Sequence, residues 1–250
     1  MRYFIAFSYF GKFYHGWQKQ PNAITVQQIL EEAFFRLLQR AVTLMGAGRT
    51  DTGVHAKQMY AHFDIDAIDD IPDLVYRLNS FLPDDIAVQN IYEVPNDAHA
   101  RFDAVERTYE YWIVQKKNPF YMDTAHYIKH SLDVGAMNRA ATVLMQYDDF
   151  ECFSKAHTDV HTFLCDIKKA EWKETGGVLV FTITADRFLR NMVRAIVGTL
   201  LNIGLGKVDV DSIKKIIESK DRGKAGVSVP AKGLYLIEVT YPKHIIKNNG

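Results

Sequence analysis

Apolar residues recur along the chain with two periods, one typical of helices and one typical of strands. Residues 2–10 alternate aromatic and smaller side chains, which predicts a strand. Residues 25–40 carry apolar side chains at helical spacing behind the capping-box pair Thr25 and Gln28, which predicts a helix. The other elements expected in the first half are strands at 41–45, 58–65 and 86–94 and a helix at 72–82, with Pro72 in its first turn. Their order is β-α-β-β-α-β.

The second half of the chain repeats this order with one additional helix. Strands are expected at 108–115, 163–172, 178–184 and 234–241, and helices at 133–147, 188–203 and 210–219. Lys-Glu-Thr-Gly-Gly before Val178 is a hairpin signal. We therefore predict an α+β protein of two ferredoxin-like units of the split βαβ type, residues 1–105 and residues 106–250. Each unit would carry an antiparallel sheet with its helices on one face, which leaves the other face for a ligand or partner.

Composition places the chain among ordinary globular proteins. Its 250 residues are 48% hydrophobic and 24% charged, and they can bury a substantial core. Cys152 and Cys165 do not form a disulfide framework, and neither a signal peptide nor a membrane span is expected, which favours a cytoplasmic location. The formal net charge is zero, so binding to nucleic acid would require the 30 basic residues to concentrate locally.

One loop carries the strongest candidate chemistry. Gly46-Ala-Gly-Arg-Thr-Asp-Thr-Gly-Val-His-Ala56 holds three glycines around Arg49, Asp51 and His55. Glycine permits backbone conformations closed to other residues and lets a ligand approach the main chain, so the loop is suited to presenting Asp51. On composition alone, a surface connection rich in turn formers explains the segment equally well. The chain lacks the short motifs of dinucleotide-binding folds, P-loop enzymes, serine hydrolases and zinc proteases.

The Gly-Arg-Thr-Asp-x-Gly-Val-His-Ala pattern of this loop resembles the active-site signature of the tRNA pseudouridine synthase A family. Three further segments resemble the family in the same order, His15-Gly-Trp-Gln18, Met192-Val-Arg194 and Lys232-Gly-Leu-Tyr-Leu236, so the resemblance covers nearly the whole chain. It implies the pseudouridine synthase fold. Thr52 stands where the family most often has Ala, a small change that we expect to be tolerated.

The resemblance also implies roles for individual residues. Asp51 would be the nucleophile, and Arg194 would pair with it, since a guanidinium remains charged and holds a carboxylate through two parallel bonds. Tyr109 would stack on the target uracil, and Arg49 would enter the RNA stack in place of the extruded base. Two more residues are candidate substrate contacts: His55 and Arg190.

The residues alone leave other interpretations open. Arg187, Arg190 and Arg194 share one face of the predicted helix and could form a solvated stripe. Tyr111 points the same way as Tyr109 on a strand and is its rival. Arg49 could instead brace the loop through a salt bridge.

By resemblance, the chain isomerises uridine to pseudouridine at positions 38, 39 and 40 of the tRNA anticodon stem-loop, as a homodimer. We expect neither metal nor cofactor, because the product is an isomer of the substrate. A zinc site has candidate ligands of the right types but no closely spaced pair, and we do not predict one. These ligands are Cys152, His157, His161 and Cys165.

Two functions from other classes compete with this interpretation. A non-catalytic RNA-binding module of two RRM-like units would explain the fold and the aromatic residues, but it has no need of Asp51. A hydrolase with an Asp nucleophile would explain Asp51, but it would release free uracil or a cleaved product. Neither accounts for all four motifs.

Overall fold

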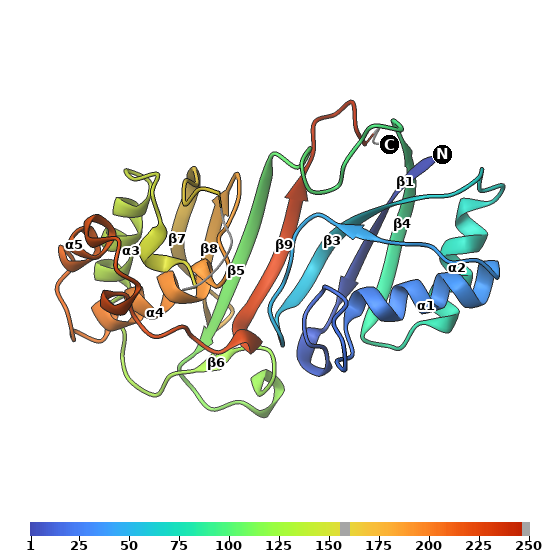
Figure 1. The fold of residues 1–250 in the computed structure, drawn as a ribbon. Coiled ribbons are helices and arrows are strands. Elements are labelled where there is room, and N and C mark those ends of the chain that lie inside the picture. The colour runs from blue at the N-terminus through green and yellow to red at the C-terminus, as the bar shows by residue number, and fades with distance from the viewer. Residues whose placement is uncertain (156–160, 247–250) are drawn as a thin grey trace. The chain divides into compact units, whose positions relative to one another are not determined.

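Residues 1–155 and 161–246 are described by the computed structural model, in which the chain is a mixed α+β protein (Figure 1). Contacts divide the chain into two units. Unit 1 comprises Met1–Glu106 together with the segment from Tyr235 onward, and unit 2 comprises Arg107–Leu234. The C-terminal segment, which the sequence-based division gave to the second unit, is therefore part of unit 1. In the described part of the chain, no helix has the length and apolar character needed to cross a membrane.

The sheet of unit 1 contains strands from both ends of the chain. Its strands are β1 (Arg2–Tyr9), β2 (Met45–Gly46), β3 (His55–Asp64), β4 (Ile86–Val94) and β9 (Leu234–Thr240). The order is β4–β1–β3–β9, and β2 also pairs with β3. The pairs of β1 with β3 and β4, and of β2 with β3, are antiparallel, whereas β9 runs parallel to β3 with His55 opposite Tyr235. The prediction of a purely antiparallel sheet is therefore wrong for this unit.

Two helices, α1 (Val26–Leu38) and α2 (Ile71–Phe81), cover one face of this sheet (Figure 1). The ring of Phe34 on α1 lies 4.9 Å from that of Phe63 on β3. The Asn79 side chain of α2 both donates to and accepts from the Val88 backbone of β4, at 2.8 Å in each case. Apolar burial and satisfied backbone groups thus hold both helices to the sheet.

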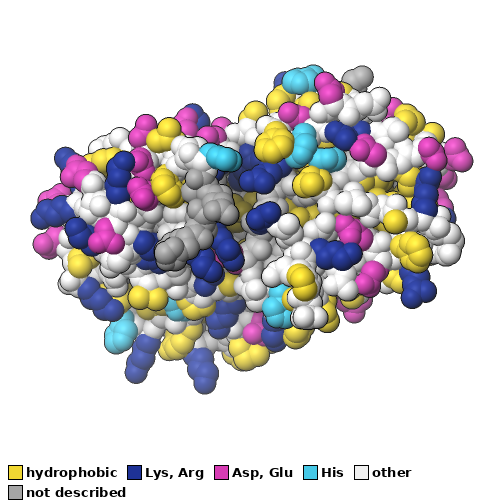
Figure 2. Space-filling view, viewed as in Figure 1, with side chains coloured by type: hydrophobic (Ala, Val, Ile, Leu, Met, Phe, Trp, Pro, Cys, Tyr) yellow, Lys and Arg dark blue, Asp and Glu magenta, His cyan; other side chains and the backbone are white. Residues whose placement is uncertain are grey.

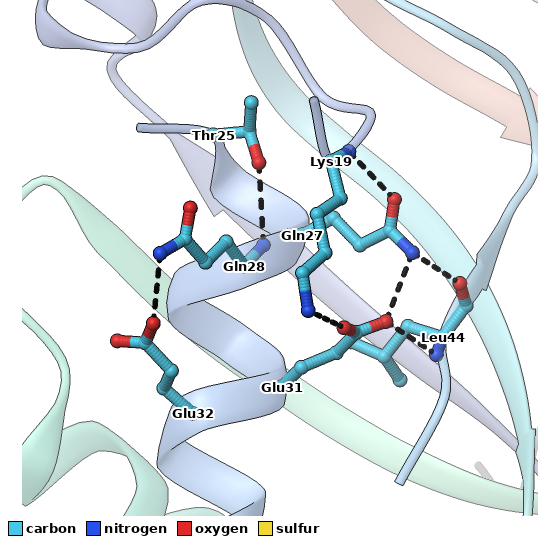
Figure 3. Close-up of polar contacts among 7 residues, drawn as sticks. All are labelled: Lys19, Thr25, Gln27, Gln28, Glu31, Glu32 and Leu44. Atoms are coloured by element: carbon cyan, nitrogen blue, oxygen red, sulfur yellow. Dashed lines mark hydrogen bonds and ion pairs between the residues drawn. The ribbon is translucent and has the colours of Figure 1, made fainter. Parts of the chain in front are cut away.

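A polar network at the start of α1 fixes the chain that leads into β2 (Figure 3). The Thr25 hydroxyl accepts from the Gln28 backbone N–H at 3.4 Å, as predicted, but the Gln28 side chain bonds to Glu32 at 2.8 Å. The Glu31 carboxylate accepts from the Leu44 backbone N–H at 3.1 Å. The Leu44 carbonyl accepts in turn from the Gln27 side chain at 3.0 Å. Residues 41–44 therefore run as a tethered loop, and the strand expected there is reduced to β2.

The second face of the unit 1 sheet is partly covered by its own chain. Tyr241 packs edge-on against Phe4, with ring centroids 5.2 Å apart, and its hydroxyl donates to the Ala100 carbonyl. The Ala100 backbone N–H donates to Nδ1 of His62 at 3.1 Å. The expectation that this whole face is left for a ligand or partner is therefore too simple.

We expect acid to destabilise unit 1 through His62, whose side chain is only 8% exposed. Burial, with the positive charges of His99 and Arg2, lowers the pKa of His62 from 6.5 to about 4. Between these values the unfolded chain binds more protons than the folded chain. The free energy of unfolding should therefore fall as the pH drops from 6.5 to 4, by about 3 kcal/mol from this group.

Urea unfolding across this pH range measures the effect. A His62→Asn variant keeps an acceptor for the Ala100 N–H and should lose less stability on acidification than the wild type. The pKa of His99 is also lowered by burial, so part of the pH dependence should remain in the variant. Equal losses in the two proteins would contradict the assignment to His62.

Unit 2 contains four of the described strands of the single mixed sheet, together with three helices. Strands β5 (Glu106–Val114), β8 (Val178–Ala185) and β7 (Ile167–Thr175) pair antiparallel in that order, and β6 (His126–Tyr127) adds to β5 in parallel. Helices α3 (Val134–Leu144), α4 (Met192–Gly204) and α5 (Ser212–Ser219) gather on one side of these strands (Figure 1). Asn138 on α3 makes two hydrogen bonds, of 3.0 and 2.7 Å, to the Trp172 backbone of β7.

Candidate functional site

The Asp51 loop, residues 47–54, runs between β2 and β3 and packs on a second loop. This second loop, residues 11–17, follows β1, and we call it the bracing loop. The Gly53 backbone N–H donates to the Tyr14 carbonyl at 3.2 Å, and the Trp17 N–H donates to the Thr50 carbonyl at 3.4 Å. The hydroxyls of Tyr9 and Thr50 are 2.8 Å apart. These bonds fix the backbone on both sides of Asp51.

Glycine makes the contact between the two loops possible. Gly16 of the bracing loop has φ +86°, and a Cβ placed there would lie 2.2 Å from the Thr50 carbonyl oxygen. A side chain at this position would therefore both strain the backbone and push the Asp51 loop away. The conformation of the Asp51 loop therefore depends on a glycine outside the loop, Gly16, as well as on Gly53 within it.

The two charged side chains near the tip of the Asp51 loop differ in exposure. Asp51 is half-buried, and its carbonyl accepts from the Val54 N–H at 3.1 Å, which closes a turn around it. Arg49 is exposed. A carboxylate in a backbone held this firmly can meet a substrate atom with little loss of conformational freedom, as a nucleophile requires.

His55 is placed differently from the expected substrate contact. Its side chain is 1% exposed and lies between the rings of Phe10 and Tyr235, with centroids at 4.3 and 4.7 Å. Its Nδ1 accepts from the Gly11 backbone N–H at 2.9 Å. A side chain with so little exposed surface is poorly placed for a direct substrate contact. We infer that His55 braces the start of β3 against the bracing loop.

In unit 2, the predicted arginine stripe is wrong because α4 begins later than expected. Asn191 precedes the helix with φ 66°, a left-handed conformation that a right-handed helix cannot include, and Met192 is the first helical residue. Arg187 and Arg190 therefore lie in the segment before α4, and Arg194 alone of the three is helical. Arg190 is exposed, and its carbonyl accepts from the Lys155 N–H at 3.1 Å.

Arg194 is tied to a segment that we call the strap, residues 226–230. Its Nε donates to the Val229 carbonyl at 2.7 Å, and its own carbonyl accepts from the Val229 N–H at 3.2 Å. The Thr199 hydroxyl accepts from the Gly226 N–H at 2.8 Å. A Cβ at Gly198 would lie 1.9 Å from the Val227 carbonyl, so only glycine allows the strap to lie this close to α4. The half-buried guanidinium is thus oriented by the Val229 carbonyl, and the same residue also holds the Arg194 backbone.

The two tyrosines of β5 are distinguished by burial. Tyr111 is 0% exposed and donates its hydroxyl to the Pro230 carbonyl at 2.9 Å, and burial raises its pKa well above the usual value. Tyr109 is half-buried, and its ring meets Phe188 edge-on at 5.1 Å. Tyr109 is therefore the better candidate for a substrate contact, and it lies beside the segment that leads into α4.

The candidate zinc ligands do not form a metal centre in the part of the chain that the structure describes. Both cysteines are buried, and burial raises the pKa of each thiol to about 12, which opposes the thiolate form that zinc binds. His157 lies outside the described residues, and His161 is exposed. Within those residues no group of three or more metal-ligating side chains occurs.

The structure adds two supporting segments, the bracing loop and the strap, that the sequence analysis did not assign to the site. Gly16 and Trp17 fall within a motif that carried the family resemblance, so a signal for the bracing loop was available. A Cβ at Gly46 would lie 2.4 Å from Nε1 of Trp17, so a side chain at position 46 would displace the Trp17 ring. No comparable signal marked the strap.

Comparisons with known proteins show which family the chain resembles over nearly its whole length. A family model described as tRNA pseudouridine synthase matches residues 5–103 and 141–242. The chain is 53% identical to the tRNA pseudouridine synthase A of Parabacteroides distasonis, over 98% of this chain and 97% of that protein. It is 51% identical to that of Bacteroides thetaiotaomicron, over 98% and 92%, and 39% identical to that of Exiguobacterium sibiricum, over 97% of each chain. The chain therefore belongs to the tRNA pseudouridine synthase A family.

Proposed function

We propose that Asp51 is the nucleophile with which this tRNA pseudouridine synthase converts uridine to pseudouridine at positions 38, 39 and 40 of the anticodon stem-loop. The carboxylate attacks either C1′ of the ribose or C6 of the uracil, and the base is freed from its N1–C1′ bond. The base then rotates, C5 bonds to C1′, the bond to the Asp51 carboxylate breaks to release the enzyme, and the C5 proton is lost. The firm backbone support of the half-buried Asp51 is the observation that carries this proposal.

The other site residues act on the base or on the carboxylate. Arg194, held by Val229, supplies the positive charge that pairs with and aims the attacking carboxylate. Tyr109 stacks on the target uracil. Arg49 is exposed and long enough to replace the extruded base in the RNA stack, and the exposed Arg190 contacts the RNA backbone.

The assembly follows the family resemblance. We propose two ferredoxin-like units in each chain and a cytoplasmic homodimer that holds one tRNA, without metal or cofactor. On the face drawn in Figure 2, Lys and Arg side chains gather at the lower left, on unit 2, although the net charge is zero. Such a local concentration is what an RNA backbone requires.

Tritium release from unmodified tRNA labelled with [5-³H]uridine tests the function, because C5 loses its hydrogen when it bonds to C1′. We expect release in proportion to pseudouridine found at positions 38 to 40. Free uracil in place of pseudouridine would favour the hydrolase. Tight tRNA binding without release would favour the non-catalytic RNA-binding module.

A further inference from the structure

An exposed aromatic ring lies on the bracing loop next to the Asp51 loop. Phe13 ends a short 3₁₀ helix, Gly11–Phe13, and is 67% exposed. The Nζ of Lys12 lies 5.0 Å from the centroid of its ring. One exposed apolar residue is common on protein surfaces and means little alone. Phe13 differs from such a residue because its backbone is anchored and is bonded to the Asp51 loop.

The backbone that carries Phe13 is anchored at both ends. The Gly11 N–H donates to the buried Nδ1 of His55 at 2.9 Å, and the Tyr14 N–H donates to the Gly11 carbonyl at 3.1 Å. The Tyr14 hydroxyl donates to the Asp85 carboxylate at 2.5 Å. Phe13 thus stands between two fixed neighbours, Gly11 and Tyr14. A ring presented in this way loses little entropy when a ligand stacks on it.

The same turn is joined directly to the Asp51 loop. The residue after Phe13, Tyr14, accepts from the Gly53 N–H at 3.2 Å, and Gly53 lies two residues after Asp51. A Cβ at Gly11 would lie 1.9 Å from the Val54 carbonyl oxygen, so the two backbones are in contact there as well. A ligand that reaches Asp51 therefore arrives beside the turn that carries Phe13.

An aromatic ring beside an ammonium group fits the chemistry of RNA. A nucleobase stacks on an aromatic face, and a phosphate pairs with a cation. We propose that Phe13 is a stacking platform for an unpaired base next to the target uridine and that Lys12 contacts the adjoining phosphate. The inference rests on the proposed function and adds a base contact to it. An unpaired base is the appropriate partner because bases in a duplex have their faces already covered.

Steady-state tritium release with tRNA tests the platform. Phe13→Ala should raise the KM for tRNA about tenfold or more with little change in kcat, since stacking on one aromatic side chain contributes about that much to binding. Phe13→Trp should restore the KM, whereas Phe13→Leu, which is apolar without a ring, should not. Tyr76→Ala is the matched control, because Tyr76 is 73% exposed on α2 of the same unit. It should behave like the wild type.

The salt dependence of tRNA binding tests the phosphate contact. Lys12→Gln should reduce the slope of log K against log salt concentration by about one, and Phe13→Ala should leave the slope unchanged. These affinities are measured by fluorescence anisotropy with labelled tRNA in an Asp51→Asn background, so that no turnover intervenes.

The outcomes separate the two proposals. An active wild type whose KM is unchanged by Phe13→Ala would overturn the platform and leave the proposed function standing. Equal effects of Phe13→Ala and Tyr76→Ala would overturn it too. A wild type that binds tRNA without releasing tritium would overturn the proposed function. Loss of binding in Phe13→Leu with recovery in Phe13→Trp supports the platform. Thermal unfolding of each variant confirms that the fold is retained.

Discussion

Replacement of Asp51 by Asn is expected to lower kcat for pseudouridine formation by at least about a thousandfold, which is the scale on which enzymes respond to loss of a covalent nucleophile. An amide is too weak a nucleophile to form the bond to carbon. Asn has nearly the shape of Asp, and the backbone groups of Thr50, Asp51 and Gly53, which the substitution leaves in place, make bonds that hold the loop. The variant should therefore fold and bind tRNA as the wild type does.

Single-turnover tritium release measures this loss, and anisotropy with labelled tRNA measures binding in parallel. Thr52→Ala is the matched control, because Thr52 is exposed one residue further along and Ala is the residue that the family most often has there. It should keep nearly full activity. An Asp51→Asn variant with a tenth or more of wild-type kcat would exclude Asp51 as the nucleophile.

Arg194→Lys is expected to reduce kcat on the order of a hundredfold, with a smaller effect on the KM for tRNA, because the change misdirects the positive charge without removing it. Lysine has no Nε–H to donate to the Val229 carbonyl, which the arginine reaches at 2.7 Å. It also cannot hold a carboxylate through two parallel bonds. The ammonium group would therefore be present but poorly aimed.

Steady-state kinetics with tRNA separate the two parameters for Arg194→Lys. The same substitution at Arg139, an exposed residue of α3 in the same unit, is the control and should leave both parameters unchanged. Comparable kcat values for the wild type and Arg194→Lys would show that charge alone is sufficient at this position. If the loss of kcat in Arg194→Lys came with a fall in thermal stability, the substitution would instead act by loosening the strap.

Local signals in the sequence predicted the parts of the fold that depend on near neighbours. Strand β4 has the predicted bounds, and α1 and α2 begin within one residue of their predicted starts. Thr25 and Asp70 accept hydrogen bonds from the first turns of these helices at 3.4 and 2.8 Å. Such caps lie a few residues from the N–H groups that they satisfy, so the sequence reveals them.

Features that depend on distant partners could not be predicted in this way. The start of α4 is set by Asn191, whose left-handed backbone leaves no trace in the apolar periodicity that continues through Phe188 and Leu189. The placement of β9 depends on pairing with β3, far earlier in the chain. The loop around Asp51 was recognisable from its resemblance to the family signature, but its support by Tyr14 and Trp17 requires knowledge of which loops meet.

The position of β9 has a consequence for synthesis of the protein. Unit 1 is discontinuous in sequence, since β3, which begins directly after the Asp51 loop, is paired with a strand near the C-terminus. The ribosome must translate all of unit 2 before Tyr235 is made, which takes on the order of ten seconds at typical rates. During that time the nascent chain carries Asp51 on an incomplete sheet. Unit 1 is therefore completed only after unit 2 has been translated, and chains terminated before Tyr235 would leave β3 without its β9 partner.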